Sequence, residues 1–187
     1  MERALVIDHS TLIIRRAAAV VLGALLVAAA AQVAVPLPGT PVPMTLQPMA
    51  VLLVGGLLGA RLGALSMILY LAMGAAGLPV FTPTVPLLGV ARLFGPTGGY
   101  LLAYPVAAWA VGAVVAEGRN VRRVALGVVA GLVLIHLGGL AQLAILTGNL
   151  SAAARFGTWP FLLGDLIKIA VLVPVLAKLT PTIRARL

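Results

Sequence analysis

The chain has 187 residues, of which 62% are hydrophobic and only 9% are charged, with a mean hydropathy of +1.17. Soluble domains carry about a quarter charged residues, so this composition excludes a water-facing surface and predicts an integral membrane protein. The net charge of +9 comes from basic residues at the ends of apolar runs, which indicates membrane topology and requires no nucleic acid. The absence of cysteine excludes disulfides, thiolate nucleophiles and thiolate metal sites.

The first apolar run predicts a membrane-spanning helix over residues 17–35. Its surroundings, "RRAAAVVLGALLVAAAAQVAVP", also resemble a cleavable signal peptide, and both interpretations stay open. The run ends at "PLPGTPVP", where four prolines in eight residues forbid a helix. The rest of the chain is a membrane protein under either interpretation.

Two short spans are expected next, over residues 46–60 and 62–77, on either side of Arg61. The following segment, residues 78–99, contains four prolines and four glycines in an apolar context. Apolar non-helical backbone at membrane depth is tolerated only when protein buries it or when it lines a cavity. We therefore expect this segment to be a folded capping loop.

Three further spans are predicted over residues 100–116, 124–146 and 159–179, which makes six in a single membrane domain. With a cytoplasmic N-terminus, ten basic residues fall on the inside and only Arg92 and Arg155 on the outside. The inside set is Arg3, Arg15, Arg16, Arg61, Arg119, Arg122, Arg123, Lys178, Arg184 and Arg186. This asymmetry predicts that both termini are cytoplasmic.

Asp165 and Lys168 are ionisable residues that stand well inside the sixth predicted span, in "FLLGDLIKIA". Residues three apart share one face of a helix, and charges within a span usually face a cavity or each other. They therefore indicate either a site for a polar ligand, reached from outside, or an ion pair that holds helices together.

Three other polar residues are candidates for the same region. Arg92 in the capping loop would make such a site attractive to an anion. His136 and Gln142 lie in the fifth span on different faces, where isolated polar residues commonly form interhelical hydrogen bonds. Gln142 is level with the site proposed above.

The first span also carries small residues at helical spacing. Ala24 and Ala28 are four apart, and small residues at that spacing let another helix approach closely. That helix could belong to a partner protein or to this chain's own bundle.

Several reaction classes find no support in the sequence. No "GxxxxGK[ST]" phosphate-binding loop, "HExxH" zinc motif or nucleophile–base–carboxylate set is present, so we expect no enzymatic activity, no catalytic residue and no metal. Nor do proton-relay carboxylates line successive spans, as an ion-coupled pump would need.

Four motifs in the same order resemble the BioY family, the biotin-specific S components of energy-coupling factor (ECF) transporters. They are "PVPMTLQ", "GLPVF", "GPTGGYLLAY" and "PFLLGDLIKIA", and the resemblance extends from about Thr40 to Leu176. It implies an all-α S-component fold of six transmembrane helices in a bacterial or archaeal cell membrane, with high-affinity capture of biotin from outside. It also implies a transmembrane coupling subunit and two ABC ATPases as partners, with no cofactor; a homo-oligomer stays open.

The same resemblance assigns roles to individual residues. Asp165 and Lys168 belong to its "GDLIK" motif, and Arg92 precedes "GPTGGY". Lys168 and Arg92 would meet the biotin carboxylate or ureido oxygen, and Asp165 would accept ureido N–H bonds. The further expected contacts are Gln47, Tyr100, Gln142 and, from the capping loop, Thr82. Ala24 and Ala28 resemble the docking surface for the coupling subunit. The alternatives to a transport subunit are an intramembrane enzyme and a structural scaffold.

Overall fold

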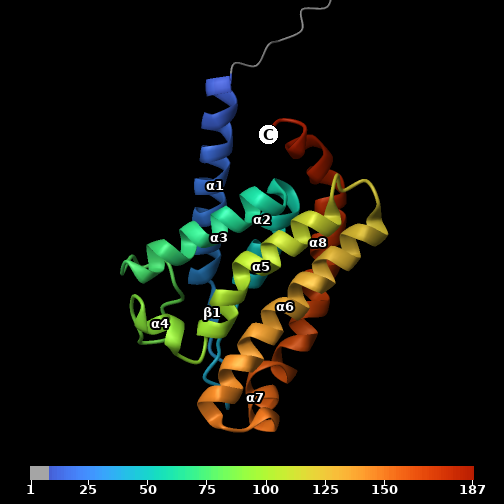
Figure 1. The fold of residues 1–187 in the computed structure, drawn as a ribbon. Helices are drawn as coiled ribbons and strands as arrows, with labels where there is room; N and C mark the ends of the chain where they lie inside the picture. Colours follow the sequence, from blue (N-terminus) through green and yellow to red (C-terminus); the bar gives the residue numbers. More distant parts are fainter. Residues whose placement is uncertain (1–8) are drawn as a thin grey trace, which may run out of the picture.

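The computed structural model describes residues 9–187 as a helical bundle with one very short strand pair (Figure 1). The long helices are α1 His9–Gln32, α2 Gln47–Leu58, α3 Ala60–Ala75, α5 Gly98–Val115, α6 Val121–Thr147 and α8 Leu162–Arg184. The short elements are β1 Ala34–Val35, β2 Met44–Thr45, α4 Ala91–Phe94, α7 Leu150–Gly157 and the 3₁₀ turn η1 Trp159–Phe161. Strands β1 and β2 pair antiparallel across the proline-rich segment, a feature the all-α prediction did not include.

The prediction of a helical membrane protein is confirmed, whereas the count of six crossings is supported only in part. Within the described residues, four segments are long and apolar enough to cross a membrane: Ser10–Gln32, Gly98–Val115, Val121–Thr147 and Leu150–Arg184. The apolar helices α2 and α3 have 12 and 16 residues. At 1.5 Å per residue each is shorter than the roughly 30 Å hydrocarbon core of a bilayer.

The break between α2 and α3 comes from a single glycine. Gly59 has φ +88°, a conformation that residues with a side chain rarely adopt, and α3 begins at the next residue. The interruption expected near Arg61 therefore lies two residues earlier. The two helices then meet α5 along small residues: a Cβ on Gly55 would stand 2.5 Å from the carbonyl oxygen of Ala108. Backbones therefore touch directly at this contact.

The face of α1 that carries Ala24 and Ala28 is buried within this chain. These two side chains are 0% and 9% exposed and belong to the hydrophobic core with Val27. A Cβ on the neighbouring Gly23 would meet Ser66 of α3 and Val54 of α2, which locates the packing partners. The stripe of small residues therefore packs within this chain's own bundle, which favours the internal alternative; docking of the coupling subunit by Ala24 and Ala28 stays a prediction.

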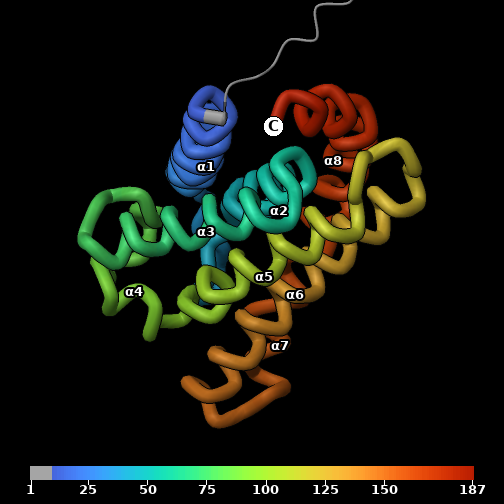
Figure 2. Tube along the Cα trace, turned by 45° about the horizontal axis from the view of Figure 1, so that its top comes forward, coloured from blue at the N-terminus to red at the C-terminus, as the bar shows by residue number. Residues whose placement is uncertain are grey.

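The start of α1 and the C-terminal end of α8 lie at the same end of the bundle, and α7 lies at the opposite end (Figures 1 and 2). The side chain of Arg16 donates a hydrogen bond to the backbone oxygen of Leu187 at 2.8 Å, which joins the two terminal regions. Helices α5 and α6 run side by side in both views. Exposed leucines, valines and Trp109 on these helices give the bundle an apolar outer surface.

Candidate functional site

An internal cavity lies where α5, α6 and α8 meet the start of α2 and the capping loop. Its wall combines apolar and aromatic side chains with a small set of polar groups, the combination typical of ligand sites. The polar and aromatic members of this wall are Thr45, Gln47, Phe81, Thr82, Arg92, Thr97, Tyr100, Tyr104, His136, Phe161, Asp165 and Lys168. Of the predicted ligand contacts, Asp165, Lys168, Arg92, Gln47, Tyr100 and Thr82 therefore share one cavity.

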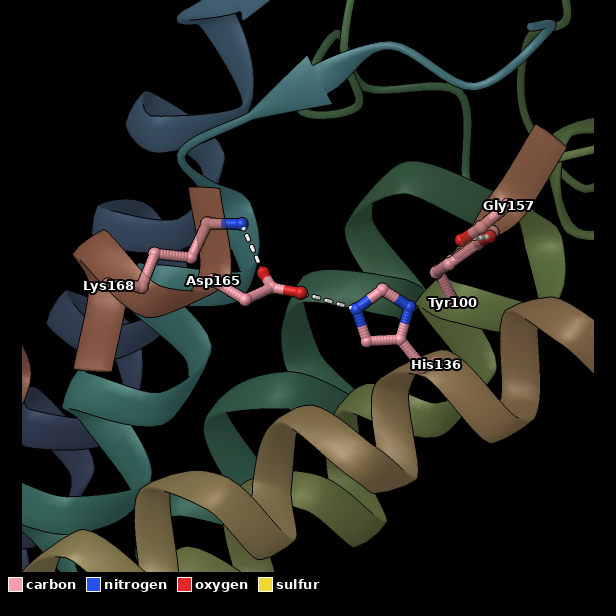
Figure 3. A network of polar contacts seen from close by, with 5 residues as sticks. All are labelled: Tyr100, His136, Gly157, Asp165 and Lys168. Carbon is pink, nitrogen blue, oxygen red and sulfur yellow. Dashed lines mark hydrogen bonds and ion pairs between the residues drawn. The ribbon is translucent and has the colours of Figure 1, made fainter. Parts of the chain in front are cut away.

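Asp165 is the centre of a three-residue polar network (Figure 3). Its Oδ1 accepts a hydrogen bond from Lys168 Nζ at 2.8 Å, within α8. Its Oδ2 is 2.6 Å from Nε2 of His136, which comes from α6. Asp165 and Lys168 are each only 7% exposed. The charged pair thus faces the cavity, and it is also linked to a second helix.

The His136–Asp165 contact was not expected from the sequence. In the sequence, His136 is only one of two isolated polar residues in its span, and its separation of 29 positions from Asp165 gives no sign that the two side chains meet. The one available signal was that His136 is the sole ionisable side chain in residues 124–146, where an ionisable group requires a partner. Thr45, Thr97 and Tyr104 also line the cavity without having been predicted.

The ring of Tyr100 lines the cavity, and its hydroxyl bonds the protein backbone. The hydroxyl donates to the backbone carbonyl of Gly157 at 2.6 Å, which ties α5 to the end of α7. A Cβ at Gly139 would stand 2.1 Å from the Tyr100 ring, so the absence of a side chain at this position makes room for the aromatic group. Since its donor is already used, Tyr100 offers a ligand mainly an aromatic surface.

Gln47 is held by two neighbours at the start of α2. Its amide nitrogen donates to the hydroxyl of Tyr70, and that hydroxyl donates to the carbonyl of Val80 in the capping loop at 3.2 Å. Its amide oxygen accepts from the Thr45 hydroxyl at 3.3 Å. The ring of Tyr70 meets Phe81 edge-on with centroids 5.4 Å apart. This chain of contacts connects the cavity wall to the beginning of the capping loop.

Arg92 is 1% exposed and organises the capping loop from within. One terminal nitrogen donates to the carbonyl of Thr82 at 2.8 Å, and the other donates to the carbonyls of Val85 and Leu87. Its Nε has no hydrogen-bond partner in the described chain. Burial lowers the pKa of this guanidinium from its usual range, yet an arginine stays protonated in proteins. The expected folded capping loop is thus present, and a buried cation fastens it.

Gln142 lies outside the cavity wall. Its amide nitrogen donates to the carbonyls of Leu93 and Gly95 at 3.0 and 2.7 Å, so it holds the end of the capping loop against α6. Because both bonds aim at backbone outside the cavity, the predicted ligand contact from Gln142 is not met by this geometry. Its side chain points toward the capping loop.

The charges around the cavity favour an anion. Two cations, Lys168 and Arg92, share the wall with one carboxylate, Asp165. No group of three or more His, Cys, Asp or Glu residues that could hold a metal occurs among residues 9–187. The arrangement suits a ligand that has an anionic group, donors for a carboxylate and an apolar body.

Comparison with known proteins assigns the chain to a family. The BioY family profile matches residues 2–185. The chain belongs to the BioY family. The probable biotin transporter BioY of Pyrococcus horikoshii is 39% identical over 139 residues, which cover 74% of this chain and 81% of that protein. The biotin transporter BioY of Thermotoga maritima is 34% identical over 154 residues, covering 82% and 89%.

A solved structure agrees with this BioY assignment at the level of the fold. The S-component for biotin from an ECF-type ABC transporter superposes with a TM-score of 0.80 at 25% identity, covering 89% of this chain and 90% of that chain. The S-component likeness predicted from the four motifs is thereby confirmed. BioY relatives are transport proteins and not enzymes, and this member is a multi-pass protein of the cell membrane.

Proposed function

We propose that this protein is the biotin-binding S component of an ECF transporter and mediates biotin uptake. The observation that carries the proposal is the buried Asp165–Lys168 pair in a cavity that Arg92 also lines. Biotin has a carboxylate, an apolar thiophane ring and a ureido group that both donates and accepts hydrogen bonds. Each part has a counterpart in the wall: cations, aromatic rings and a carboxylate.

The roles follow from the contacts already made within the protein. Asp165 has spare lone pairs for a ureido N–H, because a carboxylate has about four acceptor sites and the protein occupies two. Lys168 uses one of its three donors on Asp165, so it can also meet the biotin carboxylate or the ureido oxygen. Arg92 mainly holds the loop that carries Thr82 over the cavity. Gln47 and Tyr100 complete the wall.

The proposal includes six membrane crossings, with α2 and α3 as short spans, and cytoplasmic termini. The ten-to-two distribution of basic residues supports this orientation. It places the described start of α1 and the end of α8 inside, and the capping loop with the cavity outside. Biotin would then be captured from the exterior.

Energy would come from partner proteins, namely a transmembrane coupling subunit with two ABC ATPases. The sequence contains no phosphate-binding loop and no relay of carboxylates along successive spans. Uptake in cells with and without such a module tests this part. Accumulation that persists unchanged when every coupling subunit and its ATPases are deleted would contradict it.

Binding of labelled biotin to the detergent-purified protein tests the capture function. We expect a nanomolar dissociation constant, roughly −12 kcal/mol. Lipoic acid, which shares the carboxylate tail but lacks the ureido group, is the matched control and should bind at least a hundredfold more weakly. Absence of binding at micromolar biotin in folded protein would overturn the proposal and favour a structural role for the ion pair.

A further inference from the structure

We propose that His136 is a positioning residue of the binding site, one that holds Asp165 so that the carboxylate presents an acceptor to the ureido N–H of the ligand. This inference rests on the proposed biotin binding and deepens it. His136 reaches Asp165 from a different helix, and its Nε2 lies 2.6 Å from Oδ2 (Figure 3). Because a carboxylate oxygen accepts, the imidazole donates this bond from Nε2.

The contact is enclosed by aromatic rings that fix the imidazole. Tyr100 lies 6.5 Å away, centroid to centroid, with its ring at 78° to the imidazole, and Phe161 lies 6.4 Å away. Gly139, one turn after His136 on α6, leaves the space that the Tyr100 ring occupies. Nδ1 of His136 is buried without a hydrogen-bond partner within residues 9–187, so the ring is oriented by Nε2 and by packing.

This second contact changes what Asp165 can offer. With Lys168 as its only partner, the carboxylate could turn both oxygens toward the ammonium, because that residue lies one turn further along the same helix. The bond from α6 instead holds Oδ2 on His136 and leaves only Oδ1 on Lys168 Nζ. Both oxygens then keep a lone pair free for a ligand donor. The imidazole thus prevents the carboxylate of Asp165 from binding Lys168 through both of its oxygens.

Variants at His136 separate this role from a general effect on folding. His136→Gln places an amide N–H near the position of Nε2 and should keep biotin affinity within about threefold of wild type. His136→Leu removes the donor and should weaken binding at least tenfold. Leu137→Ala is the matched control, because that side chain is 54% exposed on the same helix and does not line the cavity. Equal affinities for His136→Leu and wild type would overturn the inference.

Two further measurements locate the effect. Biotinamide retains the ureido ring and lacks the carboxylate, so His136→Leu should weaken biotin and biotinamide by the same factor. A loss seen with biotin alone would contradict the assignment to the ureido end. In an Asp165→Asn background, His136→Leu should add less than twofold, since the imidazole acts through that carboxylate. Full additivity of the two losses would show that His136 acts independently and would overturn the proposal.

A readout without ligand distinguishes failure of this inference from failure of the proposed function. In ¹⁵N-histidine-labelled protein, the imidazole signals of His136, assigned by their loss in His136→Gln, should shift in Asp165→Asn. Unchanged signals would show that the contact is absent and overturn the inference even if wild-type protein binds biotin. A shift in protein that binds no biotin would preserve the contact but reject the binding role together with the proposed function.

Discussion

Arg92 donates a 2.8 Å hydrogen bond from one terminal nitrogen to the backbone carbonyl of Thr82, ten residues earlier in the chain. The bond closes the capping loop on itself, and the other terminal nitrogen reaches two more carbonyls of the same loop. A planar guanidinium can serve several acceptors at fixed angles, which an ammonium cannot reproduce. Arg92 therefore has two roles: it holds the capping loop in its folded conformation, and it places a positive charge at the cavity wall.

Replacing Arg92 by lysine should loosen this loop while retaining the positive charge. We expect biotin to dissociate at least tenfold faster and backbone amides of residues 82–90 to exchange more rapidly with deuterium. Arg155→Lys, at an exposed position on α7, is the control and should change neither quantity. An Arg92→Lys variant with wild-type dissociation and exchange would show that charge alone accounts for the role of this residue.

Asp165→Asn keeps the shape of the side chain and removes the acceptor charge beside Lys168. Truncating one partner of a buried charged pair costs about 2–5 kcal/mol, so biotin affinity should fall at least tenfold while folded protein is still obtained. Titration of purified protein measures the change. Glu117→Gln alters a carboxylate at the exposed Arg119 contact and should leave affinity unchanged. If folding is lost and the residual folded fraction binds normally, the pair is structural.

Gly55→Ala should destabilise the bundle where α2 and α5 touch. The new Cβ would lie 2.5 Å from the Ala108 carbonyl oxygen, and backbone cannot move aside as a side chain can. Overpacking of this kind costs about 1–3 kcal/mol. Thermal unfolding in detergent should show a lower midpoint than for Gly164→Ala, whose Cβ would meet only Met44 at 3.5 Å. Equal midpoints for the two variants would show that the helices can separate freely.

One face of α1, which carries Ala24, is buried in the bundle, and the opposite face is exposed, so a bulky substitution should have different effects on the two faces. Ala24→Trp should reduce the yield of folded protein, because this side chain is 0% exposed. Ala29→Trp changes the exposed face of the same helix and should leave folding intact. Size-exclusion profiles after purification compare the two. A well-folded Ala24→Trp protein together with a misfolded Ala29→Trp protein would reverse our assignment of the inner and outer faces.

Reporter fusions test the orientation. Fusions after Leu187 and within residues 117–123 should report a cytoplasmic location, and an insertion within residues 78–99 should report an external one. The basis is the asymmetry of arginine and lysine across the predicted loops. The opposite pattern at all three positions would place the cavity on the cytoplasmic side and contradict capture from outside.

Periodicity and composition predicted the long helices well, because long apolar runs and proline-rich breaks are local features. Each predicted span overlaps one long helix, although α1 begins eight residues before its predicted span and α6 and α8 extend a few residues beyond theirs. Helix α7 was missed because its alanine-rich sequence is too short to resemble a span. Its start is nevertheless marked by Asn149, which caps it by accepting a hydrogen bond from the Ala152 amide.

The site was predicted less completely, because a helical pattern does not fix how two helices rotate against each other. Asp165 and Lys168 could be found since both lie on one helix. The contact of His136 with Asp165 depends on the mutual rotation of α6 and α8. The burial of Ala24 within the bundle could not be predicted for the same reason. A helix face of small residues can pack equally well against a partner protein's helix or against another helix of its own chain.

The ion pair of α8 also bears on how this helix enters the membrane during synthesis. A lone charged residue at the centre of a spanning helix costs about 2.5–3.5 kcal/mol on insertion scales. Lys168 and Asp165 neutralise each other within one helical turn, so this pair needs no neighbouring helix to compensate its charges. It can partition into lipid as a complete unit and meet His136 only when the bundle assembles. The pair can thus enter the membrane within α8 without exposing an unpaired ion to lipid.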